Sequence, residues 1–287
     1  MTTSQDGEKK KNLAEYDGDD RIISAHELSL TFKDREKFTI NVKSGIPSLD
    51  HYCEGFRDGE LITISGKTKN GKTLLAQSLT YHFTEKHYQP LWFSFEVPPK
   101  QFLSQFAKTP FIYMPGKLKA HMMDWIEERI MESFIKYNTR IVFIDHLHYL
   151  FDIQKSRNPS LDIGAIIRRL KGIAVNNEFV IFLLCHTSKA KDENESYESI
   201  RDSSFVAQES DCVIMVKRTP EEGDTYARAR VEFHRRTGVM EKVVFLMKEG
   251  SYLVERARNE GECEPLPPQP KKRSAREGRG IKNYDNN

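Results

Sequence analysis

The central part of the chain alternates short apolar runs with stretches in which apolar residues recur every three or four positions. The apolar runs have the length of buried strands, and they predict strands at residues 61–65, 91–95, 141–144, 180–184, 212–216, 227–234 and 243–247. The helical spacing predicts helices at residues 73–86, 100–107, 120–136 and 161–175. Strands that alternate with helices are typical of a mostly parallel sheet with helices on both faces.

The end of this pattern differs from the rest. The last three predicted strands follow one another without room for helices between them, so we expect antiparallel hairpins there. The predicted fold class is therefore α/β, with a mostly parallel central sheet, helices on both faces and C-terminal antiparallel hairpins.

The segments outside this pattern suggest the limits of the compact domain, which we expect at residues 44–254. Residues 1–20 are polar and charged with few apolar positions, a composition typical of disorder. We interpret residues 21–43 as a short linker or oligomerisation segment, in which residues 25–30 favour a short helix. Residues 255–287 predict a disordered basic tail, which either holds nucleic acid through phosphates or is simply solvated.

Composition narrows the class of protein. The net charge is +2 over 287 residues, so any contact with nucleic acid has to come from local loops. Four cysteines without a Cys-x-x-Cys pair predict a reduced intracellular protein that has neither a disulfide framework nor a structural zinc site. Because no apolar run reaches membrane-spanning length and the start does not resemble a signal peptide, we expect a cytoplasmic protein without membrane contact.

One segment carries a nucleotide-binding motif. The Walker A pattern follows the first predicted strand and precedes the first predicted helix, which is the context that it requires, and comprises Gly66, Lys67, Thr68, Lys69, Asn70, Gly71, Lys72 and Thr73. Backbone N–H groups of such a loop bind phosphate together with the helix N-terminus. We expect Lys72 to reach the β- and γ-phosphates and the Thr73 hydroxyl to ligate a metal ion. The predicted cofactors are therefore ATP and Mg²⁺.

Two carboxylates follow apolar strands that would end at the same edge of the sheet. Asp145 ends the run at 141–144 in a Walker B pattern, where it would hold Mg²⁺ beside the Walker A loop. Glu96 follows the run at 91–95, where it would polarise the water that attacks the γ-phosphate. The alternatives are an ordinary buried strand capped by Asp145 and an N-terminal helix carboxylate at Glu96.

Three histidines follow two of the predicted strands. His186 comes after the run at 180–184 and would hydrogen-bond the γ-phosphate, although a structural histidine is the alternative. His146 and His148 follow Asp145. A His-x-His pair without a third ligand nearby is weak evidence for a metal site, so we interpret these two as packing or loop residues.

A basic turn follows the strand predicted at 227–234. Arg235 and Arg236 are adjacent in this turn. Both are solvated, or one reaches the nucleotide of a neighbouring subunit as an arginine finger that stabilises the transferring phosphate. Hydrolysis would then depend on assembly.

Together these motifs resemble the ATPase domain of DnaB-type replicative DNA helicases, including Twinkle-like and phage-type members. The resemblance covers roughly residues 40–254. Residues 93–98 (Phe-Ser-Phe-Glu-Val-Pro) are similar to the family's Ser-Leu-Glu-Met-Pro, and residues 144–148 to its Asp-Tyr-Leu-Gln segment. Residues 201–211 are similar to its Arg-Glu-Ser-Gly and Glu-Gln-Asp-Ala-Asp segment.

The resemblance implies a RecA-like P-loop fold and a role for each candidate residue. Glu96 would be the catalytic base, Asp145 the carboxylate that organises Mg²⁺, His186 the γ-phosphate sensor and Arg236 the arginine finger. It also implies a homo-oligomeric ring, a hexamer in the family's manner, with nucleotide at each subunit interface. Single-stranded DNA would thread the pore. The partners would be single-stranded or forked DNA and a primase or loader protein.

The resemblance further implies that two loops contact DNA. A basic loop that tracks phosphates needs no contact with base edges. The candidate DNA-binding residues in these loops are Lys155, Arg157, Lys189, Lys191 and Arg201.

We therefore expect an ATP-hydrolysing DNA helicase or translocase that acts on single-stranded DNA in replication. Two other classes stay open, namely a RecA/RadA-like recombination or repair ATPase and a KaiC-like regulatory ATPase without unwinding activity. Residues 44–50 also resemble the start of RadA and KaiC-type domains, whereas residues 93–98 and the basic turn favour the helicase.

Overall fold

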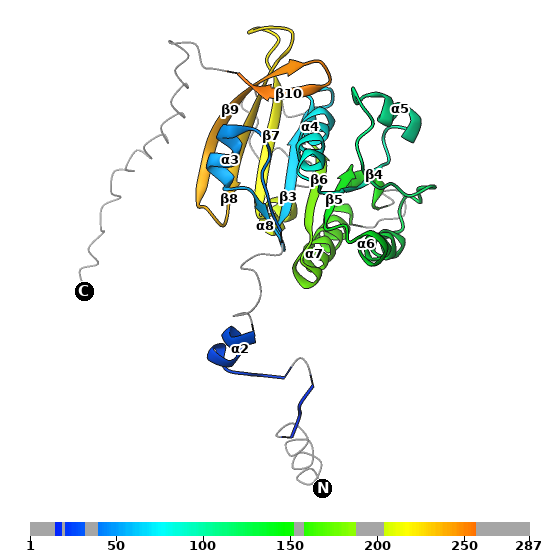
Figure 1. Cartoon of the computed structure of the whole chain (residues 1–287), viewed down its shortest axis with the longest axis vertical. Coiled ribbons are helices and arrows are strands. Elements are labelled where there is room, and N and C mark those ends of the chain that lie inside the picture. The colour runs from blue at the N-terminus through cyan, green and yellow to red at the C-terminus, as the bar shows by residue number, and fades with distance from the viewer. Residues whose placement is uncertain (1–14, 19–20, 32–39, 152–157, 188–203, 257–287) are drawn as a thin grey trace, which may run out of the picture. The chain divides into compact units, whose positions relative to one another are not determined.

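The computed structural model describes residues 15–18, 21–31, 40–151, 158–187 and 204–256 (Figure 1). The helices are α2 (Ala25–Thr31), α3 (Pro47–Cys53), α4 (Lys72–Glu85), α5 (Pro99–Ser104), α6 (Met123–Tyr137), α7 (Pro159–Asn177) and α8 (Ser204–Glu209), with the 3₁₀ turn η1 at Leu147–Tyr149. The strands are β1 (Asn41–Val42), β2 (Phe56–Arg57), β3 (Leu61–Gly66), β4 (Leu91–Ser94), β5 (Ile141–Asp145), β6 (Val180–His186), β7 (Cys212–Arg218), β8 (Tyr226–His234), β9 (Val239–Glu249) and β10 (Tyr252–Glu255). Among the residues described, no helix combines the length and apolar character needed to cross a membrane.

An eight-stranded sheet forms the centre of the domain. Its strand order is β10-β9-β8-β7-β3-β6-β5-β4, and the strands from β7 to β4 pair in parallel. Strands β8, β9 and β10 add antiparallel hairpins at the other side, and β1 and β2 form a separate two-stranded sheet. The predicted fold class, including its C-terminal hairpins, is confirmed.

Helices cover both faces of the sheet, and alternate residues of the buried strands pack against them. Phe182 of β6 packs in a core with Phe83 of α4, whereas the next residue, Leu183, packs in a second core with Ile130 of α6 and Ile167 of α7. Helices α4 and α7 can be followed on the two sides of the sheet in Figure 1. Burial on both faces explains why β5 and β6 are continuous apolar runs over residues 141–144 and 180–185. The buried hydroxyls of Thr63 and Ser65 in β3 are instead hydrogen-bonded, to Ser210 and to the backbone oxygen of Cys185.

The ends of the elements differ from the sequence-based expectations for local reasons. Helix α7 begins at Pro159, two residues before its predicted start, because the Asn158 side chain accepts a hydrogen bond from the Leu161 N–H. Helix α3 and strand β10 are too short for their apolar spacing to predict them, and they form by packing on the domain. Ser48 of α3, for example, donates its backbone N–H to the Glu255 carboxylate of β10.

We predict that Phe182→Ala destabilises the domain by about 3–5 kcal/mol, because it leaves a cavity in a close-packed core. The Phe182 ring is fully buried and stacks on Phe143 with the ring centroids 4.6 Å apart. Denaturant unfolding of the purified chain measures the loss. The matched control is Phe111→Ala, whose side chain is 63% exposed and whose substitution should change stability by less than about 1 kcal/mol. Equal losses for the two variants would contradict the placement of the core.

Candidate active site

The parallel register brings the carboxyl ends of four strands, β3, β6, β5 and β4, together along one side of the sheet. We call this side the carboxyl edge. Gly66 at the end of β3 pairs with His186 at the end of β6, and Ser94 of β4 pairs with Asp145 at the end of β5. Glu96 follows β4 by two residues. The structure thus gathers the Walker A loop, Asp145, Glu96 and His186 at this edge, as the carboxyl ends of parallel strands require.

The Walker A loop depends on two glycines with backbone conformations that other residues rarely adopt. Gly66 has a φ of 148°, and a Cβ atom added there would lie 2.3 Å from the backbone oxygen of Val216 in β7. Gly71 has a φ of 92° and precedes the first turn of α4. Side chains are excluded at Gly66 by this close approach and disfavoured at Gly71 by its φ.

The loop and the start of α4 form an anion-binding surface. The first N–H groups of a helix have no partner within the helix, and in this 14-residue helix they face the loop. Lys72 is buried, and its ammonium donates hydrogen bonds to the backbone oxygens of Gly66 (3.0 Å) and Lys67 (2.9 Å). Its positive charge therefore lies inside the loop, where a phosphate group would be attracted.

The Walker A threonine contacts the Walker B aspartate directly. The Thr73 hydroxyl donates a hydrogen bond of 2.8 Å to Oδ2 of Asp145. Burial and the nearby Glu96 carboxylate raise the pKa of Asp145 to about 6, although the bond from Thr73 acts in the opposite direction. A hydroxyl and a carboxylate are oxygen donors of the type that Mg²⁺ prefers, so the pair fits this ion.

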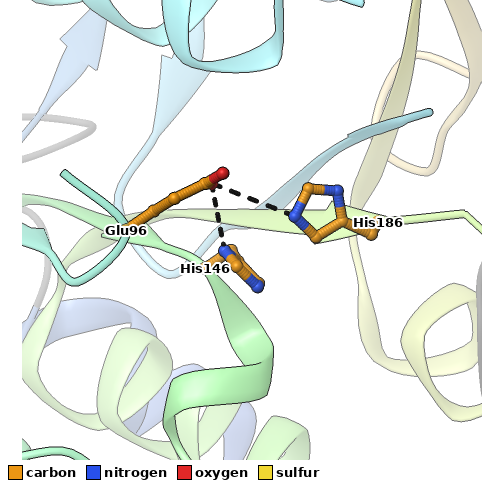
Figure 2. Close-up of side chains that lie close together, drawn as sticks. All are labelled: Glu96, His146 and His186. Atoms are coloured by element: carbon orange, nitrogen blue, oxygen red, sulfur yellow. Dashed lines mark ion pairs between the residues drawn. The ribbon is translucent and has the colours of Figure 1, made fainter. Parts of the chain in front are cut away.

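Glu96, His146 and His186 converge beside this pair, as Figure 2 shows. Oε2 of Glu96 lies 3.3 Å from Nδ1 of His146 and 3.9 Å from Nε2 of His186. The two imidazole rings meet edge to face, with their centroids 4.3 Å apart. Three adjacent strands, β4, β5 and β6, therefore each deliver one of these side chains to the same point.

Both histidines are neutral at pH 7. Burial, the neighbouring His148 and the Lys72 ammonium lower the pKa of His146 to about 4. Burial and Lys72 likewise lower the pKa of His186 to about 4. Their rings therefore each carry a nitrogen lone pair at neutral pH, and they can act as hydrogen-bond acceptors or as ligands.

A cavity of about 760 Å³ extends from the Walker A loop along the sheet edge. Its volume lies within the range of pockets that hold small molecules or cofactors. Glu96, His186 and the Walker A residues line one end. The other end is lined by residues from β7 to β10 and their loops: Arg218, Asp224, Thr225, Tyr226, Ala227, Lys248, Ser251 and Leu253. The sequence carries no local signal for this second wall, because it forms only when separate hairpins meet.

Arg236 lies on the other side of the domain from the Walker A loop, where the parallel strands begin. Its guanidinium donates to Oε1 of Glu60 (2.7 Å) and to the backbone oxygens of Cys53 and Gly55 (2.8 Å each). Glu60 immediately precedes β3, whereas the Walker A loop follows it, and six residues at about 3.3 Å each separate the two ends by about 20 Å. Arg236 is therefore not brought to the cavity of its own chain.

The adjacent Arg235 is also held within the chain. Its guanidinium donates to the backbone oxygen of Gln208. The candidate DNA-binding residues Lys155, Arg157, Lys189, Lys191 and Arg201 lie outside the described residues.

His146 is the residue whose role the sequence analysis missed. Spacing alone gives it only a packing or loop role, because the His-x-His pair has no third ligand nearby in the sequence. In the structure, its partners Glu96 and His186 come from the two neighbouring strands. Its position directly after the Walker B aspartate was the available signal.

These features define the class of protein. A central parallel strand leads through a glycine loop into a helix, and a carboxylate from the strand next but one contacts the Walker A threonine. This is the RecA-like α/β fold, with a Walker A loop and a Walker B aspartate at the carboxyl ends of its parallel strands.

The chain belongs to the AAA domain family, whose model matches residues 29–192, more than half of the chain. It is 22% identical over 260 residues to a probable replicative DNA helicase of Trieres chinensis, a match that covers 78% of this chain and 56% of that protein. It is 23% identical over 226 residues to the replicative DNA helicase DnaB of Rickettsia typhi, a match that covers 62% of this chain and 45% of that protein. The chain thus spans about half the length of these curated relatives.

Two solved structures have the same fold. One is a separately solved ATPase domain, which superposes with a TM-score of 0.70 at 19% identity, covering 82% of this chain and 99% of that domain. The other is a DnaB-like replicative helicase, described with its interactions with primase. It superposes with a TM-score of 0.69 at 18% identity, and the match covers 88% of this chain and 71% of that one. The expected resemblance to the DnaB-type ATPase domain is confirmed.

We predict that Lys72→Ala abolishes ATP hydrolysis and weakens ATP binding, because it removes the positive charge inside the Walker A loop. We expect turnover to fall by at least about 10²-fold, the effect of losing one preorganised donor to a developing charge. Phosphate release and binding of a fluorescent ATP analogue measure the two effects. The control is Lys86→Ala, an exposed lysine just beyond the far end of α4. Turnover at the wild-type rate in Lys72→Ala would remove the Walker A assignment.

Proposed function

We propose that this chain is an ATP-driven motor of the DnaB helicase type that acts on single-stranded or forked DNA in replication. The observation that carries the proposal is the contact of Thr73 with Asp145, with Glu96 beside it, at one edge of a sheet with the DnaB-type fold. The curated relatives support the DNA substrate, since they are replicative DNA helicases.

The site would bind ATP together with Mg²⁺. Lys72 and the N–H groups of the Walker A loop would hold the β- and γ-phosphates. Thr73 and Asp145 would hold Mg²⁺, either directly or through its water shell. The base and ribose would extend along the cavity toward Tyr226 and Lys248, which line its far end.

Glu96 is the candidate catalytic base. Its side chain is 41% exposed and lines the cavity, so that water can reach its carboxylate. It would accept a proton from the water that attacks the γ-phosphate. His186, which lines the same wall, would hydrogen-bond the γ-phosphate and transmit its loss to the loop that follows.

Arg236 is the candidate arginine finger, and it would act on the nucleotide of a neighbouring subunit. Because Arg236 lies far from the Walker A loop of its own chain, it would act as an arginine finger only on a nucleotide bound to another subunit. A contact that joins one edge of a subunit to the opposite edge of the next is heterologous, and such contacts form rings when the rotation closes. We propose a homo-oligomeric ring of six subunits. Arg236 would exchange its bonds to Glu60, Cys53 and Gly55 for a phosphate oxygen.

DNA would pass through this ring. The basic residues Lys155, Arg157, Lys189, Lys191 and Arg201 are the candidates for contacts with its phosphates, which need no base recognition. A primase or a loader protein is the proposed protein partner, in line with the DnaB-like helicase whose interactions with primase have been described.

We predict that the wild-type chain displaces a strand from a forked DNA duplex with ATP and Mg²⁺, and that Glu96→Gln does not. The variant keeps the size of the side chain but removes the proton acceptor, so it should still bind ATP. Strand displacement and ATP turnover with and without single-stranded DNA are measured together. The control is Glu85→Gln, an exposed residue at the end of α4.

Each outcome of this experiment is informative. ATP turnover that DNA stimulates, but without unwinding, would replace the helicase by a DNA-dependent ATPase of the recombinase type. Turnover that DNA does not change would favour a regulatory ATPase. Unwinding by Glu96→Gln at the wild-type rate would contradict the role of Glu96 as the base.

We predict that Arg236→Ala keeps ATP binding but lowers turnover of the assembled protein by about 10³-fold. Because Arg236 also bonds within its own chain, a loss alone does not separate the two roles. A mixture of Arg236→Ala and Lys72→Ala subunits separates the role within the chain from the role between subunits. The Lys72→Ala subunits supply an intact Arg236 to the intact Walker A loops of their neighbours, so turnover should recover in the mixture. If the mixture stays as inactive as each variant alone, Arg236 does not act between subunits.

A further inference from the structure

The Glu96, His146 and His186 side chains form a constellation that the motor mechanism does not require as a unit. The mechanism uses Glu96 and His186 separately and gives His146 no role. Their three ligand atoms nevertheless all lie within 4.8 Å of one another. In Figure 2, both imidazole rings present a nitrogen to the same carboxylate.

His146 is the side chain that indicates a bound ion. It is only 8% exposed, and within the described part of the chain its buried Nδ1 makes no hydrogen bond. The nearest carboxylate oxygen, Oε2 of Glu96, lies 3.3 Å away. A buried polar atom without a hydrogen bond costs free energy, and a shared cation between this nitrogen and this oxygen would remove that cost.

We propose that Glu96, His146 and His186 form a binding site for a divalent transition-metal ion of the Zn²⁺ type. The site lies beside the Thr73–Asp145 pair but is distinct from it in chemistry. Two imidazole nitrogens and one carboxylate suit Zn²⁺, Co²⁺ and Ni²⁺, whereas Mg²⁺ prefers oxygen ligands alone.

The distances fit such an ion with small side-chain movements. Ligand bonds of about 2.0–2.2 Å in a tetrahedral site place the ligand atoms about 3.3–3.5 Å apart. The pair between Glu96 and His146 is already at 3.3 Å, and the pair between Glu96 and His186 needs to close from 3.9 Å. Rotation of the half-exposed Glu96 side chain supplies this movement. The two histidine nitrogens lie within 4.8 Å of each other, and rotation of the imidazole rings would have to bring them to the same spacing.

The local charge and access also favour a cation. The Glu96 and Asp145 carboxylates and the Lys72 ammonium face this point, so the charge around the two neutral histidines is net negative. Glu96 and His186 line the cavity, whereas His146 is buried beside Glu96. Three protein ligands leave the fourth position open toward the cavity, where water or a phosphate oxygen would bind.

Binding of such an ion would oppose hydrolysis. The ion would occupy the Glu96 lone pair that accepts the proton from water, and it would hold His186 away from the γ-phosphate. Zn²⁺ is therefore expected to inhibit ATP turnover in the presence of excess Mg²⁺. This consequence rests on the proposed function, whereas the metal site itself does not.

The test is a titration of the untagged full chain with Co²⁺ in the absence of nucleotide, followed by the visible d–d absorption of four-coordinate Co²⁺. We expect saturation at one equivalent, displacement by Zn²⁺ and no displacement by Mg²⁺. Glu96→Gln and His186→Gln should each weaken binding by at least about tenfold, since even residues that only orient metal ligands change affinity by about 10–100-fold. His51→Gln, which removes an exposed histidine of α3, should leave binding unchanged.

The outcomes separate the metal site from the motor. Absence of the Co²⁺ band in the wild type, or equal binding by all four proteins, would overturn the site. Because Glu96 is substantially exposed, Glu96→Gln should fold, and circular dichroism checks this for both ligand variants. Suppose that the chain binds Co²⁺ in a way that depends on Glu96 and His186 but does not hydrolyse ATP. This result would support the metal site and refute only the proposed function.

Discussion

The parallel register of β3, β6, β5 and β4 is the constraint on which the site depends. It places Gly66 opposite His186 and Ser94 opposite Asp145, so that one sheet edge holds the loop, the carboxylates and the histidines. Burial on both faces fixes this register, because a slip of one residue would exchange the side chains that pack against the two helical layers. The hydrophobic cores therefore position the chemistry.

The same burial sets the protonation states at the edge. Burial is the first cause that raises the pKa of Asp145 and lowers the pKa of His146 and His186. Within the described part of the chain, the Thr73 hydroxyl and the Lys72 charge are the interactions that offset the desolvation of the ionised Asp145. A cation bound to its oxygens would add the missing compensation, so nucleotide-bound Mg²⁺ and the charge on Asp145 are expected to stabilise each other.

Local sequence predicted what local interactions decide. Every predicted strand and helix is present, because each has an apolar pattern or a motif of its own, and the Walker A loop was found from its glycines. The rest needed long-range contacts that spacing does not encode. His146 acquires its neighbours only when β4, β5 and β6 align, and Tyr226 reaches the cavity only when the hairpins fold back. The short helix α3 combines a local start, in which the Asp50 carboxylate accepts from the Ser44 and Gly45 N–H groups, with a bond from Ser48 to Glu255, 207 positions away in sequence.

Arg236 illustrates how topology restricts a role that sequence leaves open. Strand β8 runs antiparallel to β7, so that His234 at its end pairs with Cys212 at the start of β7. The turn that follows must therefore lie at the edge where β3 begins, next to Glu60, and not where β3 delivers the Walker A loop. An arginine in this turn can have two roles: it can stabilise its own chain, or it can contact another subunit. Its bonds to Glu60, Cys53 and Gly55 provide the first, and they also hold the guanidinium in one place. Action on a neighbouring phosphate would break these bonds and leave the buried Glu60 carboxylate without this partner, so the contact between subunits has to offset that cost.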